Sequence, residues 1–131
     1  MLGDPRMDNR LKVVRASDRR PDTASGAMVR EAAISRGLVG AEQLWVGYVE
    51  LPPGMRSAPH HHGDCESAIY IISGSARFLT GDGFQNVETA AAGDFVWVPP
   101  QIAHIEENAS ATEAVRMVVA RSTQETLVFN V

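Results

Sequence analysis

Three of the four histidines in the chain are consecutive, His60, His61 and His62, and the fourth is His104. Because side chains alternate between the two faces of a strand, His60 and His62 point one way and His61 points the other. Two imidazoles from one strand and a third from a different strand can meet at a point inside a barrel. Imidazole nitrogen binds several first-row transition metals. The spacing therefore indicates a metal site formed by His60, His62 and His104, with His61 at the surface.

The segments around these histidines are short, rich in β-branched and aromatic residues, and separated by glycine and proline. The sequence predicts strands over residues 44–51, 67–73, 76–80, 85–89, 95–98, 102–108, 113–120 and 126–131. Residues 28–34 are compatible with a short strand or with a helical turn. Many short strands without a long helix predict an all-β sandwich or barrel.

Composition limits the class of protein. The chain has 131 residues, of which 44% are hydrophobic and 21% charged, as expected for one globular domain. No apolar run approaches the roughly 20 residues that cross a bilayer, and the first residues lack a secretory signal, so no membrane partner is expected. The single cysteine, Cys65, cannot form an internal disulfide, and a reducing cytoplasm is the simplest location.

Charge is unevenly distributed along the chain. The net charge is −4, yet six of the twelve basic residues lie among the first twenty positions. We interpret residues 1–26 as a polar, flexible N-terminal arm and residues 27–131 as a single barrel domain. A nucleic-acid-binding arm would carry a longer and denser basic run with interleaved aromatic residues, so no nucleic-acid partner is expected.

Two blocks of the sequence resemble the two motifs of the cupin superfamily. Gly54, His60, His62 and Glu66 have the spacing of the first motif, and the second motif matches at Gly93, Pro99, His104 and Asn108. The glycine usually found two residues after the proline is Gln101 here. The resemblance covers about residues 40–120. It implies a jelly-roll β-barrel that holds one divalent metal through the histidines and often through the glutamate.

One departure from the family pattern leaves the role of Glu66 open. Seven residues separate Glu66 from Gly74, whereas the family usually has six. Counting back from Gly74 places Ser67 at the metal-facing position and Glu66 on the opposite face. Either a β-bulge turns Glu66 inward as a fourth ligand, or three histidines hold the metal and water or substrate completes the site.

Other residues near the motifs have less specific patterns. Glu106 has the same strand parity as His104, so it is a candidate fourth ligand or catalytic base, or else a carboxylate at the barrel rim. Cys65 is interpreted as a bystander thiol. Trp45, Trp97 and Phe95 are expected in the core or in the wall of a pocket.

The resemblance implies two classes of function. The first is a metal-dependent enzyme that uses Fe, Mn, Ni or Zn on a small organic substrate. Proteins of this kind include dioxygenases, isomerases, cyclases and lyases, so an oxidoreductase is among the expected activities and the fold does not select the reaction. The second is a non-catalytic module that binds a small ligand and acts with a partner chain.

A homodimer is also expected from the sequence. Small barrels with apolar strands near both chain ends leave strand edges that a second copy can cover. The apolar segment at residues 127–131 is the expected contributor to this interface, and the basic arm is expected to lie outside it.

Overall fold

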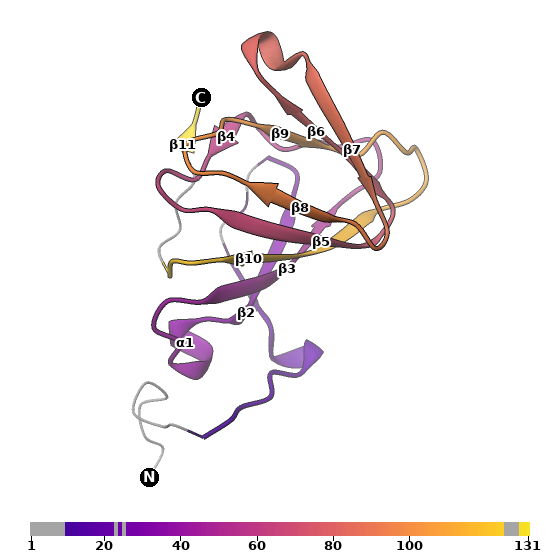
Figure 1. Ribbon diagram of the computed structural model, residues 1–131. Helices are drawn as coiled ribbons and strands as arrows, with labels where there is room; N and C mark the ends of the chain where they lie inside the picture. Colours follow the sequence, from indigo (N-terminus) through magenta and orange to yellow (C-terminus); the bar gives the residue numbers. More distant parts are fainter. Residues whose placement is uncertain (1–9, 23, 25, 125–128) are drawn as a thin grey trace.

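The computed structural model describes residues 10–22, 24, 26–124 and 129–131 of the chain. Antiparallel strands dominate this part of the chain, so the all-β prediction is confirmed (Figure 1). Its helical elements are α1 (Arg36–Val39) and the 3-10 turns η2 (Ala16–Asp18) and η3 (Asp82–Phe84). None of the helices in the described ranges has the length and apolar character needed to cross a membrane.

The strands form three sheets (Figure 1). The largest has the strand order β1 (Arg20–Pro21), β2 (Val29–Ile34), β3 (Trp45–Leu51), β10 (Val115–Arg121), β5 (Ser67–Ser73) and β8 (Phe95–Val98). The second has the order β7 (Asn86–Ala91), β6 (Ser75–Thr80) and β9 (Ile105–Glu107). The third pairs β11 (Phe129–Asn130) with β4 (His60–His61).

Most predicted strands are present, with the following differences. Within residues 28–34, whose structure the sequence left open, Val29–Ile34 form strand β2. The strand predicted over 102–108 is reduced to β9, because Gln101 has a positive φ of 65° and the chain leaves the sheet after the two prolines. Residues 125–128 of the last predicted strand lie outside the described residues. Within the predicted arm, Arg20–Pro21 pairs with β2 as strand β1.

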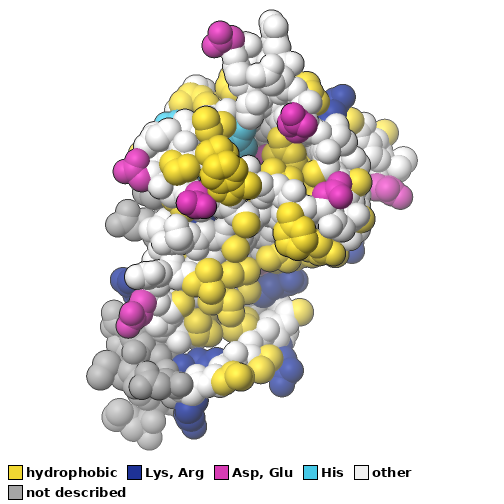
Figure 2. All heavy atoms as spheres, viewed as in Figure 1, with side chains coloured by type: hydrophobic (Ala, Val, Ile, Leu, Met, Phe, Trp, Pro, Cys, Tyr) yellow, Lys and Arg dark blue, Asp and Glu magenta, His cyan; other side chains and the backbone are white. Residues whose placement is uncertain are grey.

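Alternate residues of the central strands build the core. Val49 on β3, Met117 on β10 and Ile71 on β5 are cross-strand neighbours, and all three are fully buried. Trp45 is also in the core, as predicted, whereas Phe95 and Trp97 on edge strand β8 are exposed. The hydrophobic side chains over β5 and β8 therefore form an outer apolar face, visible in Figure 2.

A tight turn at Gly74 connects the two sheets that face each other across the barrel. Gly74 follows the end of β5 and has a φ of +83°, a left-handed conformation that disfavours residues with a Cβ. A Cβ at this position would lie 2.6 Å from the carbonyl oxygen of Ala114. The close approach of the backbone before β10 therefore requires glycine here.

Three glycine-to-alanine variants separate backbone strain from this steric contact. Gly54 has a φ of +71° but no atom within 4 Å of an added Cβ, and Gly37 in α1 has neither constraint. We expect Gly37→Ala to raise the free energy of unfolding by about 0.5–1 kcal/mol through helix propensity, and Gly54→Ala to lower it by about 1–2 kcal/mol. Gly74→Ala should lower it further. Urea denaturation measures all three, and equal losses at Gly54 and Gly74 would contradict the steric role of Ala114.

Candidate metal centre

His60 and His104 are joined through their backbones. The His60 nitrogen donates to the His104 carbonyl oxygen at 3.0 Å, and the His104 nitrogen donates to the His60 carbonyl oxygen at 2.8 Å. This is an isolated antiparallel bridge between the segment of β4 and the segment that leads into β9. Residues paired in this way direct their side chains to the same side of the ladder, and here that side is the barrel interior.

The three predicted ligands lie together in the interior. His60, His62 and His104 are all buried, and their ring nitrogens suited to bind one ion lie within 4.8 Å of one another. The ring centroids of His60 and His104 are 4.3 Å apart, and those of His60 and His62 are 4.8 Å apart. These three histidines could hold a metal ion.

His61 points away from this cluster, as strand alternation predicts. Its ring stacks on Phe129 with centroids 5.0 Å apart, and its Nδ1 accepts a hydrogen bond from the Gly63 nitrogen. His61 therefore fastens β4 to the C-terminal strand β11 and takes no part in the histidine cluster.

Hydrogen bonds to carbonyl groups orient two of the imidazoles. Nδ1 of His60 lies 2.8 Å from the Ala58 oxygen, and Nδ1 of His104 lies 3.0 Å from the Ile102 oxygen. A carbonyl only accepts, so Nδ1 donates in both rings and the neutral ring presents the Nε2 lone pair. Nε2 of His104 is buried and has no hydrogen-bond partner among the described residues. A metal ion fits this donor set because it uses that lone pair.

Glu106 is the acidic residue of the cluster. It lies two residues after His104, is buried, and places Oε1 3.7 Å from Nε2 of His104. Its Oε2 has no hydrogen-bond partner within the described part of the chain. Ser57 holds the backbone of Glu106, since the Ser57 nitrogen donates to the Glu106 carbonyl and the Glu106 nitrogen donates to Ser57 Oγ. The carboxylate is thus an interior group and not a rim residue.

Charge and burial act against each other in this cluster. Burial would raise the pKa of Glu106, but His104, His60 and Arg30 lower it to about 2, so the carboxyl group is ionised. Burial would lower the pKa of His104, but Glu106 outweighs that effect and raises it. The pKa of His60 is lowered, mainly by burial. A divalent cation binds carboxylate and neutral imidazole, so it would displace the proton that Glu106 favours on His104.

The structure places Glu66 away from the histidines. Its side chain is exposed, and its Oε1 accepts a hydrogen bond from Trp97 Nε1 at 3.1 Å on the outer face of the barrel. The inward position belongs to Ser67, which begins β5 and is buried. The structure therefore has no β-bulge that turns Glu66 inward, and it matches the alternative in which the three histidines hold the metal without Glu66.

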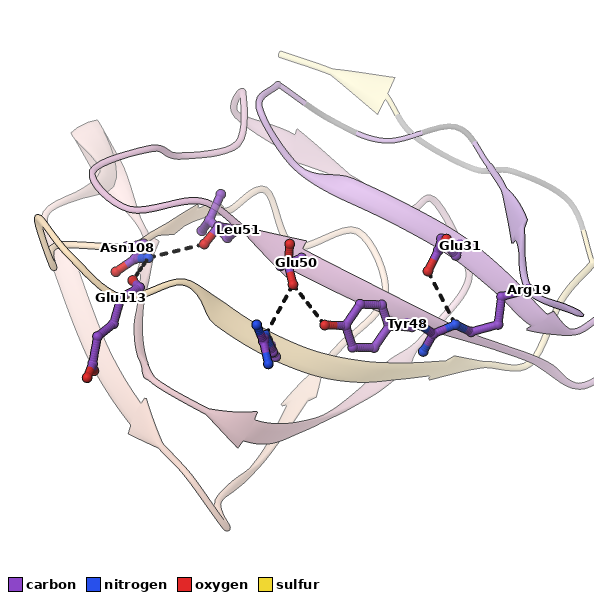
Figure 3. A network of polar contacts seen from close by, with 8 residues as sticks. Arg19, Glu31, Tyr48, Glu50, Leu51, Asn108 and Glu113 are labelled. Carbon is purple, nitrogen blue, oxygen red and sulfur yellow. Dashed lines mark hydrogen bonds and ion pairs between the residues drawn. The ribbon is translucent and has the colours of Figure 1, made fainter. Parts of the chain in front are cut away.

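Asn108, the last residue of the second motif, closes one end of the barrel. Its Nδ2 donates to the carbonyl oxygens of Leu51, Pro52 and Glu113, and Figure 3 shows it between Leu51 and Glu113. These bonds tie the end of β9 to β3 and to the segment before β10. Asn108 therefore positions the strand that carries Glu106.

Two buried arginines were not predicted from the sequence. Arg30 on β2 and Arg121 on β10 have relative exposures of 5% and 4%, and their side chains flank Trp45. Arginine is usually a surface residue, and residues 28–34 were not assigned to a strand. If β2 is recognised as a strand, Arg30 lies on the same face as the buried residue Ala32. This shared face is the sequence signal that would have predicted a buried Arg30.

The chain was compared with protein-family models and with curated proteins. A family model described as a cupin domain matches residues 47–121 of the chain. A comparison of the sequence with curated proteins finds no match.

Solved structures share the fold. The polyketide cyclase RemF from Streptomyces resistomycificus is 21% identical with a TM-score of 0.78, over 93% of this chain and 86% of that chain. Oxalate oxidase in complex with the substrate analogue glycolate is 19% identical with a TM-score of 0.68, over 80% of this chain and 55% of that chain. The Mn(II)-containing oxalate decarboxylase from Bacillus subtilis is 22% identical with a TM-score of 0.71, over 89% of this chain and 31% of that chain. The predicted jelly-roll fold is confirmed.

Removing an imidazole from the cluster should empty the site. We expect His62→Ala and His104→Ala each to lose most of the bound divalent metal. A site with two imidazoles binds a first-row ion far more weakly than a site with three imidazoles. His61→Ala is the matched control and should keep the metal content of the wild type. Elemental analysis per chain measures the effect, and full occupancy in both cluster variants would contradict the assignment.

The two glutamates should behave differently when each loses its charge. Glu106→Gln removes the buried carboxylate and should lower metal affinity by at least tenfold. Glu66→Gln changes an exposed side chain and should leave the affinity unchanged. Metal titration with a competing chelator compares the two variants. A loss of affinity confined to Glu66→Gln would show that Glu66 moves inward when the metal binds.

Proposed function

The chain belongs to the cupin family, and we propose that it is a metal-dependent enzyme that acts on a small organic substrate. The observation that carries the proposal is the buried set of His60, His62, His104 and Glu106, which converges inside the barrel. Converging titratable groups with shifted pKa values are typical of functional sites.

Each residue of the set has a role in this proposal. The three histidines hold a divalent metal through their inward ring nitrogens. When bound, the metal supplies a Lewis acid that polarises a substrate oxygen. Glu106 either completes the ligand set, which its ionised state suits, or accepts a proton from the substrate, for which its lowered pKa makes it a weak base.

The identity of the metal is proposed as Fe, Mn, Ni or Zn. Imidazole suits all four ions, and a carboxylate favours the harder ones among them. The Mn(II) centres of oxalate decarboxylase, a structural neighbour, support manganese as one candidate.

The reaction is proposed to be of the cyclase, isomerase or oxygenase type. The polyketide cyclase supports the first type, because the likeness extends over 86% of that chain. Oxalate oxidase supports oxygen chemistry, although the likeness covers only 55% of that chain. An oxidoreductase and a ring-closing enzyme are therefore both within the proposal.

Metal reconstitution tests the proposal. We expect protein stripped with a chelator to be inactive towards a panel of small hydroxy acids, keto acids and polyketide-like phenols, and to regain turnover with one of the four ions. Turnover with Zn(II) or Ni(II) and no oxygen uptake would indicate a cyclase or isomerase, whereas turnover only with Fe(II) or Mn(II) and coupled oxygen uptake would indicate an oxygenase. His104→Ala is the inactive control. Saturable ligand binding without turnover under any metal would contradict the enzyme and favour a binding module.

We also propose a homodimer. The support is the outer apolar face over β5 and β8, on which Tyr70, Ile72, Phe95 and Trp97 are exposed.

The sequence predicted that residues 127–131 contribute to the interface. Phe129–Asn130 already pairs with β4 of the same chain, so this segment leaves less unpaired strand edge for a second copy. Light scattering should give twice the 14.2 kDa of one chain, and Trp97→Glu should shift the mass towards the monomer. A wild-type mass of one chain would reject the dimer.

A further inference from the structure

We propose that Arg30 and Arg121 form a subsite inside the barrel that binds the carboxylate group of the substrate. The inference rests on the proposed function, because it names the substrate class of the same interior. It assigns a role to two residues that neither cupin motif contains.

Both guanidinium groups are buried without sufficient partners. Nε and Nη1 of Arg30 and Nη2 of Arg121 are buried donors with no hydrogen-bond partner within the described residues. Within the described part of the chain, Arg121 makes one hydrogen bond, from Nε to the Thr123 oxygen at 3.4 Å. Arginine is rarely buried unless it is paired, and an unsatisfied buried donor is costly. Three such donors on two neighbouring side chains point to a ligand that accepts hydrogen bonds.

Trp45 holds the two arginines in position. The centre of the Arg121 guanidinium lies 4.0 Å from the Trp45 ring centroid, and that of Arg30 lies 5.6 Å from it. The ring occupies the space over Gly47, where a Cβ would lie 2.3 Å from an indole carbon. Cation–π contact with a fixed ring reduces the freedom of both side chains, so their donors are preorganised.

The charges of the interior favour an anion. Arg30 interacts with Glu106, but no ion pair joins these two among the described residues, and the charge of Arg30 also reaches His60. Asp22 adds a half-buried negative charge near both arginines. If Glu106 serves a bound metal, its charge is no longer available to the arginines. The remaining positive charge suits a carboxylate, whose two oxygens match guanidinium donors.

The position of the pair relative to the histidines fits one small molecule. Arg30 is the cross-strand neighbour of Val49, and Arg121 lies between Trp45 and Ser67 in the sheet. Arg30 also interacts electrostatically with Glu106 and with His60. We therefore expect a small substrate whose carboxylate is bound by Arg30 to lie beside the proposed metal ligands.

Lactate and its neutral counterpart lactamide test the subsite by calorimetry, on the full chain stripped of metal and again after zinc loading. We expect wild type to bind lactate at least tenfold more tightly than lactamide in both states. Arg30→Gln and Arg121→Gln should each weaken lactate binding about ten- to hundredfold, as expected for a lost hydrogen bond to a charged group. Arg116→Gln is the matched control, because Arg116 is exposed on the outer face of β10 and bonds Glu50.

Further arms keep the two proposals distinguishable. Arg30→Lys retains the charge and should bind lactate better than Arg30→Gln, which separates anion binding from a purely structural role if Arg30→Gln folds poorly. His104→Ala should lose metal yet still bind lactate when stripped, so failure of the metal site leaves the subsite intact. Equal binding of lactate and lactamide, or unchanged lactate binding in both glutamine variants, would overturn the subsite. Tighter binding of inorganic phosphate than of lactate would overturn its assignment to carboxylates.

Discussion

The two backbone hydrogen bonds between His60 and His104 determine most of the geometry of the candidate site. They set the register of two segments that are far apart in the sequence, and a paired register places both imidazoles on the inner side. Alternation along each segment then adds His62 and Glu106, each two residues further on. A slip by one residue would turn this whole set outward and replace it with His61 and Ile105. The chemistry of the interior is thus a consequence of strand pairing.

This dependence explains how far the sequence alone could predict the site. The period of a strand was sufficient to place His60 and His62 on one face, and the spacing of the second cupin-like motif added His104. Glu66 and Ser67 could not be decided in the same way, because their parity depends on where β5 begins. The structure begins β5 at Ser67, and the hydrogen bond from Trp97 holds Glu66 outside. That bond joins two strands whose pairing cannot be read from local sequence.

The arginines were beyond prediction for a different reason. Strand β2 has few residues that distinguish it from a helical turn, and its assignment depends on pairing with β3. Only that pairing shows that Arg30 shares an inward face with Val49 as its neighbour. Arg121 lies at the end of β10, where a charged residue would ordinarily turn to solvent. Trp45 keeps both side chains inside, and this contact joins three strands that no local pattern connects.

The distribution of unsatisfied groups is an argument for function that does not depend on family resemblance. A buried polar group without a partner costs about 1–3 kcal/mol, and apolar residues of similar volume are often more stabilising than buried charges. Within the described ranges, such groups are found in the interior, on Arg30, His104, Glu106 and Arg121. A barrel selected only for stability would not concentrate this cost in one place. The concentration is expected where a metal and an anionic ligand satisfy those groups, so the groups that are costly to bury are the ones that the ligands require.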